Sequence, residues 1–242
     1  MKKTVLTLSL VSLFISSTVF AAPVANLKVA GSITPPTCTV NGGDNVDLIY
    51  NFGDIAPSVI PQNTTYNDLP RISNNLTVTC DAETFLTFKA TDNYPNAFIQ
   101  TPGMNINFRS HTFNLVDSTD TTKTVGGITY QWEDVTVDGQ PAYISRANDG
   151  ENDNGNWSGS ERMVKNATNG WTTTQQRYVA PSVLDLLSGK IFEATFINAT
   201  GLSYGVSRTY LHSKTMLTDD EIDITNGLDY IGQVVLTFNF GV

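Results

Sequence analysis

The C-terminal segment alternates apolar and polar residues more regularly than any other part of the chain. Val234, Leu236, Phe238 and Phe240 fall on one face of an extended chain, and Thr237 falls on the other. A period of two residues is typical of a β-strand that buries one face. We therefore predict that the chain ends in a strand whose apolar face covers a core.

Similar patterns recur throughout the sequence. They predict strands at 46–52, 76–80, 86–90, 112–116, 128–132, 135–137, 142–144, 192–196 and, more weakly, 219–225. The segments 76–80 and 86–90 are expected to form a hairpin, and Asp138-Gly139 favours a tight turn into the strand that follows it. About ten short strands with many Thr, Asn and Gly residues predict an all-β fold, an antiparallel β-sandwich.

Two other segments lack the strand pattern. Pro181 to Leu187 is the one plausible helix, with a proline at its start and Gly189 just beyond its end. From Ala147 to Gly170 the composition shifts to Asn, Asp, Gly and Ser with few aliphatic residues. We expect this stretch to be a long exposed insertion.

The first 21 residues have the pattern of a signal peptide. Lys2 and Lys3 precede a largely apolar run, and Val19-Phe20-Ala21 is a suitable cleavage site. The alternative, a membrane anchor, requires a longer run without the many Ser and Thr residues found here. The sequence thus predicts an exported chain. The full sequence has a net charge of −9, which makes nucleic acid an improbable partner.

The chain has two cysteines, Cys38 and Cys80. In an exported protein a disulfide is the default state, and two cysteines allow only one connectivity. The alternatives are two free buried thiols or a metal site, and both histidines are distant in sequence from either cysteine. We predict the Cys38–Cys80 disulfide.

The segment just after the predicted cleavage site also has a strand pattern. Leu27, Val29, Gly31 and Ile33 share one face, and the segment ends at two prolines, which cannot continue a ladder. The pattern alone allows two interpretations. The segment is either the first strand of its own domain or a strand that pairs with another chain.

Motifs for catalysis are missing from the sequence. There is no phosphate-binding glycine loop, no Cys-x-x-Cys and no His-Glu-x-x-His, and Gly155 to Gly159 has its serine one place too late for a nucleophile elbow. Ser110-His111 and His212-Ser213 are pairs that chance supplies freely. We expect no catalytic residue, no cofactor and no enzymatic activity.

Two polar stretches suggest ligands only weakly. Asp149, Glu151 and Asp153 place oxygen ligands at alternate positions but lack the glycine and glutamate of an EF-hand, so a solvated loop is favoured over a metal site. Trp157 and Trp171 could stack on a sugar. Loop aromatics that fold back on the sandwich are the favoured alternative.

The sequence resembles the subunits of bacterial chaperone-usher fimbriae, particularly a group of fimbrial-like exported proteins. The resemblance lies in Ala25 to Cys38, which contains Asn26-Leu27-Lys28-Val29 and Ile33-Thr34-Pro35-Pro36, and continues in 76–82 and 89–93. It is strong over the first third of the chain, looser over the last fifty residues and weak between them.

The resemblance implies an incomplete immunoglobulin-like sandwich of the pilin type, with long loop insertions. Its implied divisions are a signal peptide at 1–21, a donor-strand extension at 22–36 and the sandwich domain at 37–242. Leu27, Val29, Gly31 and Ile33 match the pocket-filling positions of a donor strand, and the strand with Val234, Leu236, Phe238 and Phe240 matches the one that flanks the acceptor groove and contacts the chaperone.

The resemblance also implies partners and a location. The partners are neighbouring fimbrial subunits, a periplasmic chaperone and an outer-membrane usher, with a host glycan or surface receptor as a further candidate. The chain is expected to pass through the periplasm to a fimbrium at the cell surface, as a structural subunit that polymerises by donor-strand complementation. The alternative is an adhesin or a periplasmic carbohydrate-binding sandwich that does not polymerise.

Overall fold

A computed structural model describes residues 27–99, 101, 106–150, 159–200 and 208–241. The predicted signal peptide lies outside these residues. The chain divides into two units, Met1–Pro35 and Pro36–Val242. No helix within the described ranges is long and apolar enough to cross a membrane.

The second unit is built almost entirely of strands. They are β1 Cys38–Val40, β2 Ser73–Asp92, β3 Phe113–Asp117, β4 Thr124–Ile128, β5 Tyr130–Val137, β6 Gln140–Pro141, β7 Tyr143–Ala147, β8 Asn169–Thr172, β9 Arg177–Val179, β10 Ser188–Asn198, β11 Tyr210–Leu211, β12 Tyr230–Ile231 and β13 Val234–Phe240. The described helices are one α-helix, α1 Lys214–Asp219, and short 3-10 turns at Pro57–Val59, Ile106–His111 and Pro181–Val183.

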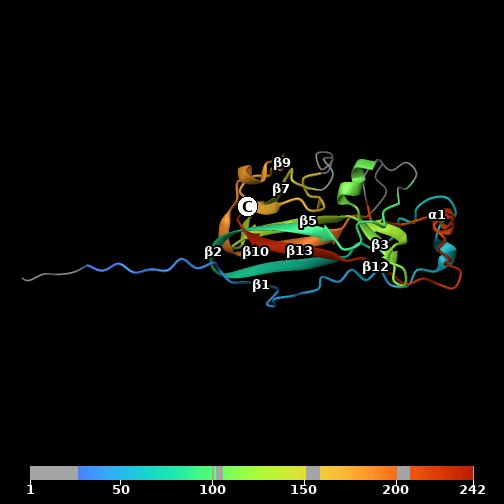
Figure 1. Ribbon diagram of the computed structural model, residues 1–242, viewed down its shortest axis with the longest axis horizontal. Helices are drawn as coiled ribbons and strands as arrows, with labels where there is room; N and C mark the ends of the chain where they lie inside the picture. Colours follow the sequence, from blue (N-terminus) through green and yellow to red (C-terminus); the bar gives the residue numbers. More distant parts are fainter. Residues whose placement is uncertain (1–26, 100, 102–105, 151–158, 201–207, 242) are drawn as a thin grey trace, which may run out of the picture. The chain divides into compact units, whose positions relative to one another are not determined.

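These strands form two sheets (Figure 1). The larger has the order β6-β5-β10-β2-β8-β7-β9, and β1 and β13 also pair with β2; the smaller has the order β11-β4-β3-β12. Every ladder between described strands is antiparallel except that between β7 and β9. The predicted fold class is therefore confirmed: the domain is an all-β, immunoglobulin-like sandwich.

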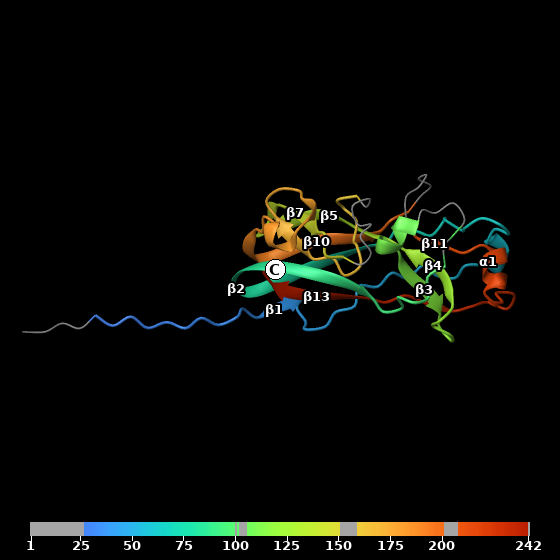
Figure 2. The same ribbon diagram turned by 45° about the horizontal axis from the view of Figure 1, so that its top comes forward.

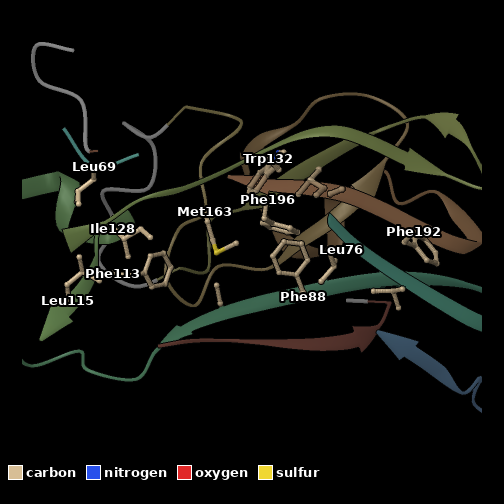
Figure 3. Close-up of a cluster of buried hydrophobic side chains, with 14 of the residues drawn as sticks. Leu69, Leu76, Phe88, Phe113, Leu115, Ile128, Trp132, Met163, Phe192 and Phe196 are labelled. Carbon is tan, nitrogen blue, oxygen red and sulfur yellow. The ribbon is translucent and has the colours of Figure 1, made fainter. Parts of the chain in front are cut away.

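The core has two aromatic and aliphatic groups that meet at Met163. In Figure 3, Phe88, Trp132, Phe196 and Leu76 lie on one side of the Met163 side chain, and a second group with Phe113 and Ile128 lies on the other. The Phe88 ring is 5.6 Å from that of Trp171 and 5.9 Å from that of Phe238, centroid to centroid. One continuous apolar core thus connects the two sheets.

The predicted disulfide is present. Cys38 in β1 lies directly opposite Cys80 in β2, and their sulfur atoms are bonded. The bridge closes a loop with a sequence separation of 42, which restricts the unfolded chain by about 4 kcal/mol in the loop-entropy model. The disulfide thus links β1 covalently to β2, the strand with which it pairs.

The tight turn predicted at Asp138-Gly139 is also confirmed. It connects β5 to β6, and both turn residues have positive φ, 49° for Asp138 and 73° for Gly139. This is the backbone geometry that a two-residue hairpin turn requires.

The predicted hairpin of 76–80 and 86–90 is wrong. Both segments belong to the single 20-residue strand β2. The residues between them, Asp81-Ala82-Glu83-Thr84-Phe85, include no Gly, Pro or Asn that would stop a strand. β2 pairs mainly with β10 in its first half and with β13 and β8 in its second half. It therefore connects two groups of strands within the larger sheet.

Three further expectations are also wrong. The described second half of the 147–170 insertion is largely buried, with Met163, Val164 and Ala167 in the interior. Only Pro181–Val183 of the predicted helix is helical, as one 3-10 turn. The weak strand predicted at 219–225 does not form, since Asp219 is instead the last residue of α1. The sequence pattern did not predict this helix, which begins just after Ser213, whose side chain caps it.

Candidate functional site

The segment 46–52, predicted as a strand, has no strand partner. Its burial alternates as in a strand: Leu48, Tyr50 and Phe52 are half-buried against the core, whereas Ile49 is 62% exposed. No backbone–backbone hydrogen bond joins residues 44–52 to any other described residue. The prediction of a paired strand is therefore wrong, although the prediction of its buried face is right.

Side chains hold this unpaired segment in place instead. The Asn74 amide donates a hydrogen bond to the carbonyl oxygen of Ile49 at 2.9 Å, and the Tyr50 hydroxyl donates to that of Phe196 at 3.1 Å. The segment is therefore anchored to β2 and β10 by single contacts. Apart from the Ile49 carbonyl oxygen, which accepts from Asn74, its backbone groups stay available for pairing.

β13 presents a second free edge. It pairs only with β2 among the described strands, placing Leu236 opposite Ala90 and Phe238 opposite Phe88. Val234, Leu236 and Phe238 turn toward the core and are half-buried. The predicted C-terminal strand is thus present, and its outer backbone edge has no partner in the described structure.

A groove lies between these two unpaired edges. It has a volume of about 730 Å³. One wall is 44–52 and the other runs from Tyr230 to Phe238. The floor is formed by core side chains: Leu76, Leu115, Ile128, Tyr130, Met163 and Phe196. Figure 2 shows β13 along β2, with the stretch after β1 continuing as a coil toward β3.

The groove continues into a second hollow of about 770 Å³. Tyr50, Phe52 and Tyr230 line both hollows. The second hollow extends past them to a floor of aliphatic residues: Ile60, Val125, Leu211 and Leu217. Together the two hollows form one long cleft along the side of the sandwich.

Three half-buried tyrosines line the groove, whose walls also carry Asp44 and Asp47. Burial raises the pKa of Tyr50 to about 12, and burial, with a smaller contribution from Tyr66, raises that of Tyr230 to about 12. Burial also raises the pKa of Tyr130, whose ring lies 5.1 Å from that of Tyr50. All three hydroxyls are therefore protonated at neutral pH, and the cleft floor favours an apolar occupant.

Gly232 allows the C-terminal chain to change sheets. β12 pairs with β3 in the smaller sheet, whereas β13, two residues later, pairs with β2 in the larger one. A Cβ atom on Gly232 would lie 2.7 Å from a Leu115 methyl and 3.1 Å from the Asn114 carbonyl oxygen. A glycine at this crossing lets one continuous edge run along both sheets.

The predicted donor residues lie in the first unit. Residues 27–35 belong to no strand, and the side chains of Leu27, Val29 and Ile33 are fully exposed. A Cβ atom on Gly31 would meet nothing within 4 Å.

Phe240 differs from the other predicted residues of its strand. Val234, Leu236 and Phe238 line the groove, but Phe240 is outside the lining and is 48% exposed. It pairs with Leu86, and the next residue, Gly241, donates a backbone hydrogen bond to Phe85. The groove wall thus ends before the strand does.

The weaker ligand candidates do not assemble into a site among the described residues. Trp171 is fully buried in β8, and its indole nitrogen donates to the Glu193 carbonyl oxygen at 3.1 Å. Asp149 contacts Lys89 and Thr168, whereas Trp157, Glu151 and Asp153 lie outside the described residues. The described residues contain no group of three or more potential metal ligands.

A buried ion pair that no sequence pattern predicted lies at the end of the groove wall. The Lys165 ammonium is 2.9 Å from the Asp92 carboxylate, and both side chains are almost fully buried. Asp92 also accepts hydrogen bonds from the backbone and amide of Asn114 and from the Tyr94 backbone, and it lies opposite Val234. This network fixes the start of β13.

No protein-family model matches the sequence, and a search of curated proteins finds no significant relative.

Proposed function

We propose that this protein is a structural subunit of a bacterial surface fimbria, which polymerises when the N-terminal segment of one copy fills the groove of the next. One observation carries the proposal: an apolar groove is bounded on both sides by backbone edges that have no strand partner. Such a surface is a template for strand addition.

The N-terminal segment has the chemistry that this groove needs. Leu27, Val29 and Ile33 can point into the groove on one face, while backbone groups pair with 44–52 and β13. The predicted segment 27–33 and β13 both have seven residues. Burial of the three aliphatic side chains would contribute about 5–8 kcal/mol, enough for a durable contact between subunits.

The open groove also explains the need for a chaperone and an usher. Before assembly, an exposed apolar cleft beside two free edges would aggregate. We propose that a periplasmic chaperone covers it and that an outer-membrane usher delivers the subunit to the cell surface. A carbohydrate-binding role has weaker support, because Trp171, one of its two aromatic candidates, is buried in the core.

The test is a pair of variants in the mature, chaperone-purified protein. Gly31→Leu places a large side chain on the groove-facing side of the donor segment, and Ala30→Leu places the same side chain on the opposite side. We expect Gly31→Leu to abolish polymerisation as measured by light scattering, with an unchanged melting temperature, because a Cβ atom on Gly31 would meet no atom within 4 Å.

Ala30→Leu should polymerise as the unaltered protein does. Deletion of residues 22–34 should give a chain that still binds its chaperone but cannot join a neighbour. Normal polymerisation of either Gly31→Leu or the deletion variant would refute the proposal.

A further inference from the structure

The two hollows of the cleft differ in the shape of their walls. Along the first hollow both walls are extended, and a pairing strand can follow them. At the second hollow both walls turn: Gly53 has φ 68°, Gly227 has φ 91°, and a 3-10 turn begins at Pro57. A ladder of backbone hydrogen bonds cannot follow walls that turn away, so the occupant of this hollow must need no such ladder.

The side chains of the second hollow suit a particular kind of peptide. Tyr50, Phe52 and Tyr230 supply half-buried aromatic surface, with Ile55 and Leu228 beside them. Aromatic-lined grooves recognise proline-rich segments, which are stiff and lack the backbone N–H groups that would otherwise need partners. The polyproline conformation also loses little entropy on binding.

The donor segment continues into such a peptide. Ile33 is followed by Thr34-Pro35-Pro36-Thr37. Thr37 is already fixed in its own domain, because its backbone N–H donates to the Asp81 carboxylate at 2.9 Å and its carbonyl accepts from the Asp81 N–H at 3.0 Å. If Ile33 lies in a neighbour's groove, the chain from Ile33 to Thr37 spans at most about 14 Å.

We propose that Pro35 and Pro36 of an incoming copy dock in the second hollow of the acceptor, against Tyr50, Phe52 and Tyr230. This inference rests on the proposed function. A donor strand antiparallel to β13 has its C-terminal end at the β12 end of the groove, which is where the second hollow begins. The antiparallel arrangement is also that of all the described ladders except one.

The docked prolines would determine how two subunits sit against each other. The strand part of the donor supplies affinity through its aliphatic side chains. Pro35 and Pro36 lie two residues and one residue before Thr37, so their docking fixes the distance and tilt of the donor domain. The second hollow is thus a positioning site between subunits and not an extension of the strand slot.

The test measures binding of fluorescent synthetic peptides of residues 22–37 to the mature Gly31→Leu chain, which retains an open groove and, on the proposed function, cannot donate. One peptide has the natural sequence, one carries Pro35→Ala with Pro36→Ala, and a control peptide carries Ser32→Ala on the outward face. We expect the proline-free peptide to bind about three- to tenfold more weakly, the range for loss of an aromatic contact, and the control to bind normally.

A second set of acceptors locates the effect. The difference between the natural and the proline-free peptide should disappear in Tyr230→Ala, or in Leu228→Ala if Tyr230→Ala does not fold. It should remain in the control Tyr143→Ala, which alters an exposed tyrosine outside the cleft lining. Equal binding of the two peptides, or a difference that persists in both cleft variants, would overturn the inference and leave the proposed function intact. Failure of the natural peptide to bind at all would overturn both.

Discussion

The buried carboxylate of Asp92 makes several polar contacts near the groove. It holds Lys165, Asn114 and the Tyr94 backbone where β2 ends and β13 begins. Asp92→Asn would leave the Lys165 ammonium buried without a counter-charge. We expect a loss of about 3–5 kcal/mol in the free energy of unfolding, measured by urea denaturation.

Lys89→Met provides the matched control for that measurement. Lys89 pairs with Asp149 at 2.9 Å, but both side chains are partly exposed to solvent. Solvent-exposed pairs contribute little, so we expect a change of about 1 kcal/mol or less. Equal losses in the two variants would show that the buried pair has no special role.

His212 gives the domain a dependence on pH. It is buried between β11 and α1, and neither ring nitrogen has a hydrogen-bond partner among the described residues. Burial lowers the pKa of His212 from 6.5 to about 4. Between these values the unfolded chain binds a proton that the folded chain does not, so stability falls as the pH drops through this window, by about 3 kcal/mol at pH 4.

The variant His212→Leu should reduce this dependence. Its free energy of unfolding should fall less than that of the unaltered protein between pH 7 and pH 4, with the difference again about 3 kcal/mol. His111, whose pKa is lowered to about 3 by burial and by nearby Arg162, Arg146 and Lys165, should keep part of the slope in both proteins. Identical pH profiles would mean that His212 is not the titrating group.

At the scale of elements, β13 has one face for the groove and one for solvent. Leu236 lines the groove, whereas the adjacent Thr237 is exposed and lies outside the lining. Leu236→Ala should weaken binding of the 22–37 peptide about tenfold through lost apolar contact, and should lower stability by about 2 kcal/mol. The check is fluorescence titration together with urea denaturation.

Thr237→Ala shortens a side chain on the other face of the same strand. It should leave peptide binding within about twofold of normal, because exposed substitutions away from a contact have small effects. If Thr237→Ala weakened binding as much as Leu236→Ala does, the peptide would not be bound through the groove face of β13.

The sequence predicts faces of elements better than it predicts their neighbours. The alternation of Leu48, Tyr50 and Phe52 correctly indicates which side chains turn inward, but a period of two residues carries no information about whether a partner strand exists. The same limit explains β2, where two alternating segments suggested two strands although no turn residue separates them.

Buried polar residues were the other source of error. Lys165, Thr168 and Asn169 made the second half of the 147–170 stretch look exposed, yet all three are buried. Lys165 pairs with Asp92, which is distant in the chain, and Thr168 donates to Asp149 at the opposite end of the same stretch. Composition within a segment cannot reveal such contacts. The six-residue helix α1 was too short for its period to stand out.

At the scale of the whole molecule, the candidate site is made by an interruption of the sandwich. The C-terminal chain crosses from the smaller to the larger sheet at Gly232, so the unpaired edge runs past both, and 44–52 faces it across the core. The sequence predicted β13 and the disulfide. It could not predict the cleft, because the floor is assembled from five strands and the Met163 loop, each of which is an ordinary core strand or loop by itself.

The central claim is that the cleft accepts an apolar strand from another copy. Amide hydrogen exchange of the mature Gly31→Leu chain, with and without the synthetic 22–37 peptide, tests this most directly, because the amides on both walls must gain partners at once. We predict slower exchange in both 44–52 and β13 on addition of peptide, with little change in β7 and β9. Binding that protects neither wall, or no binding at millimolar peptide, would contradict the account.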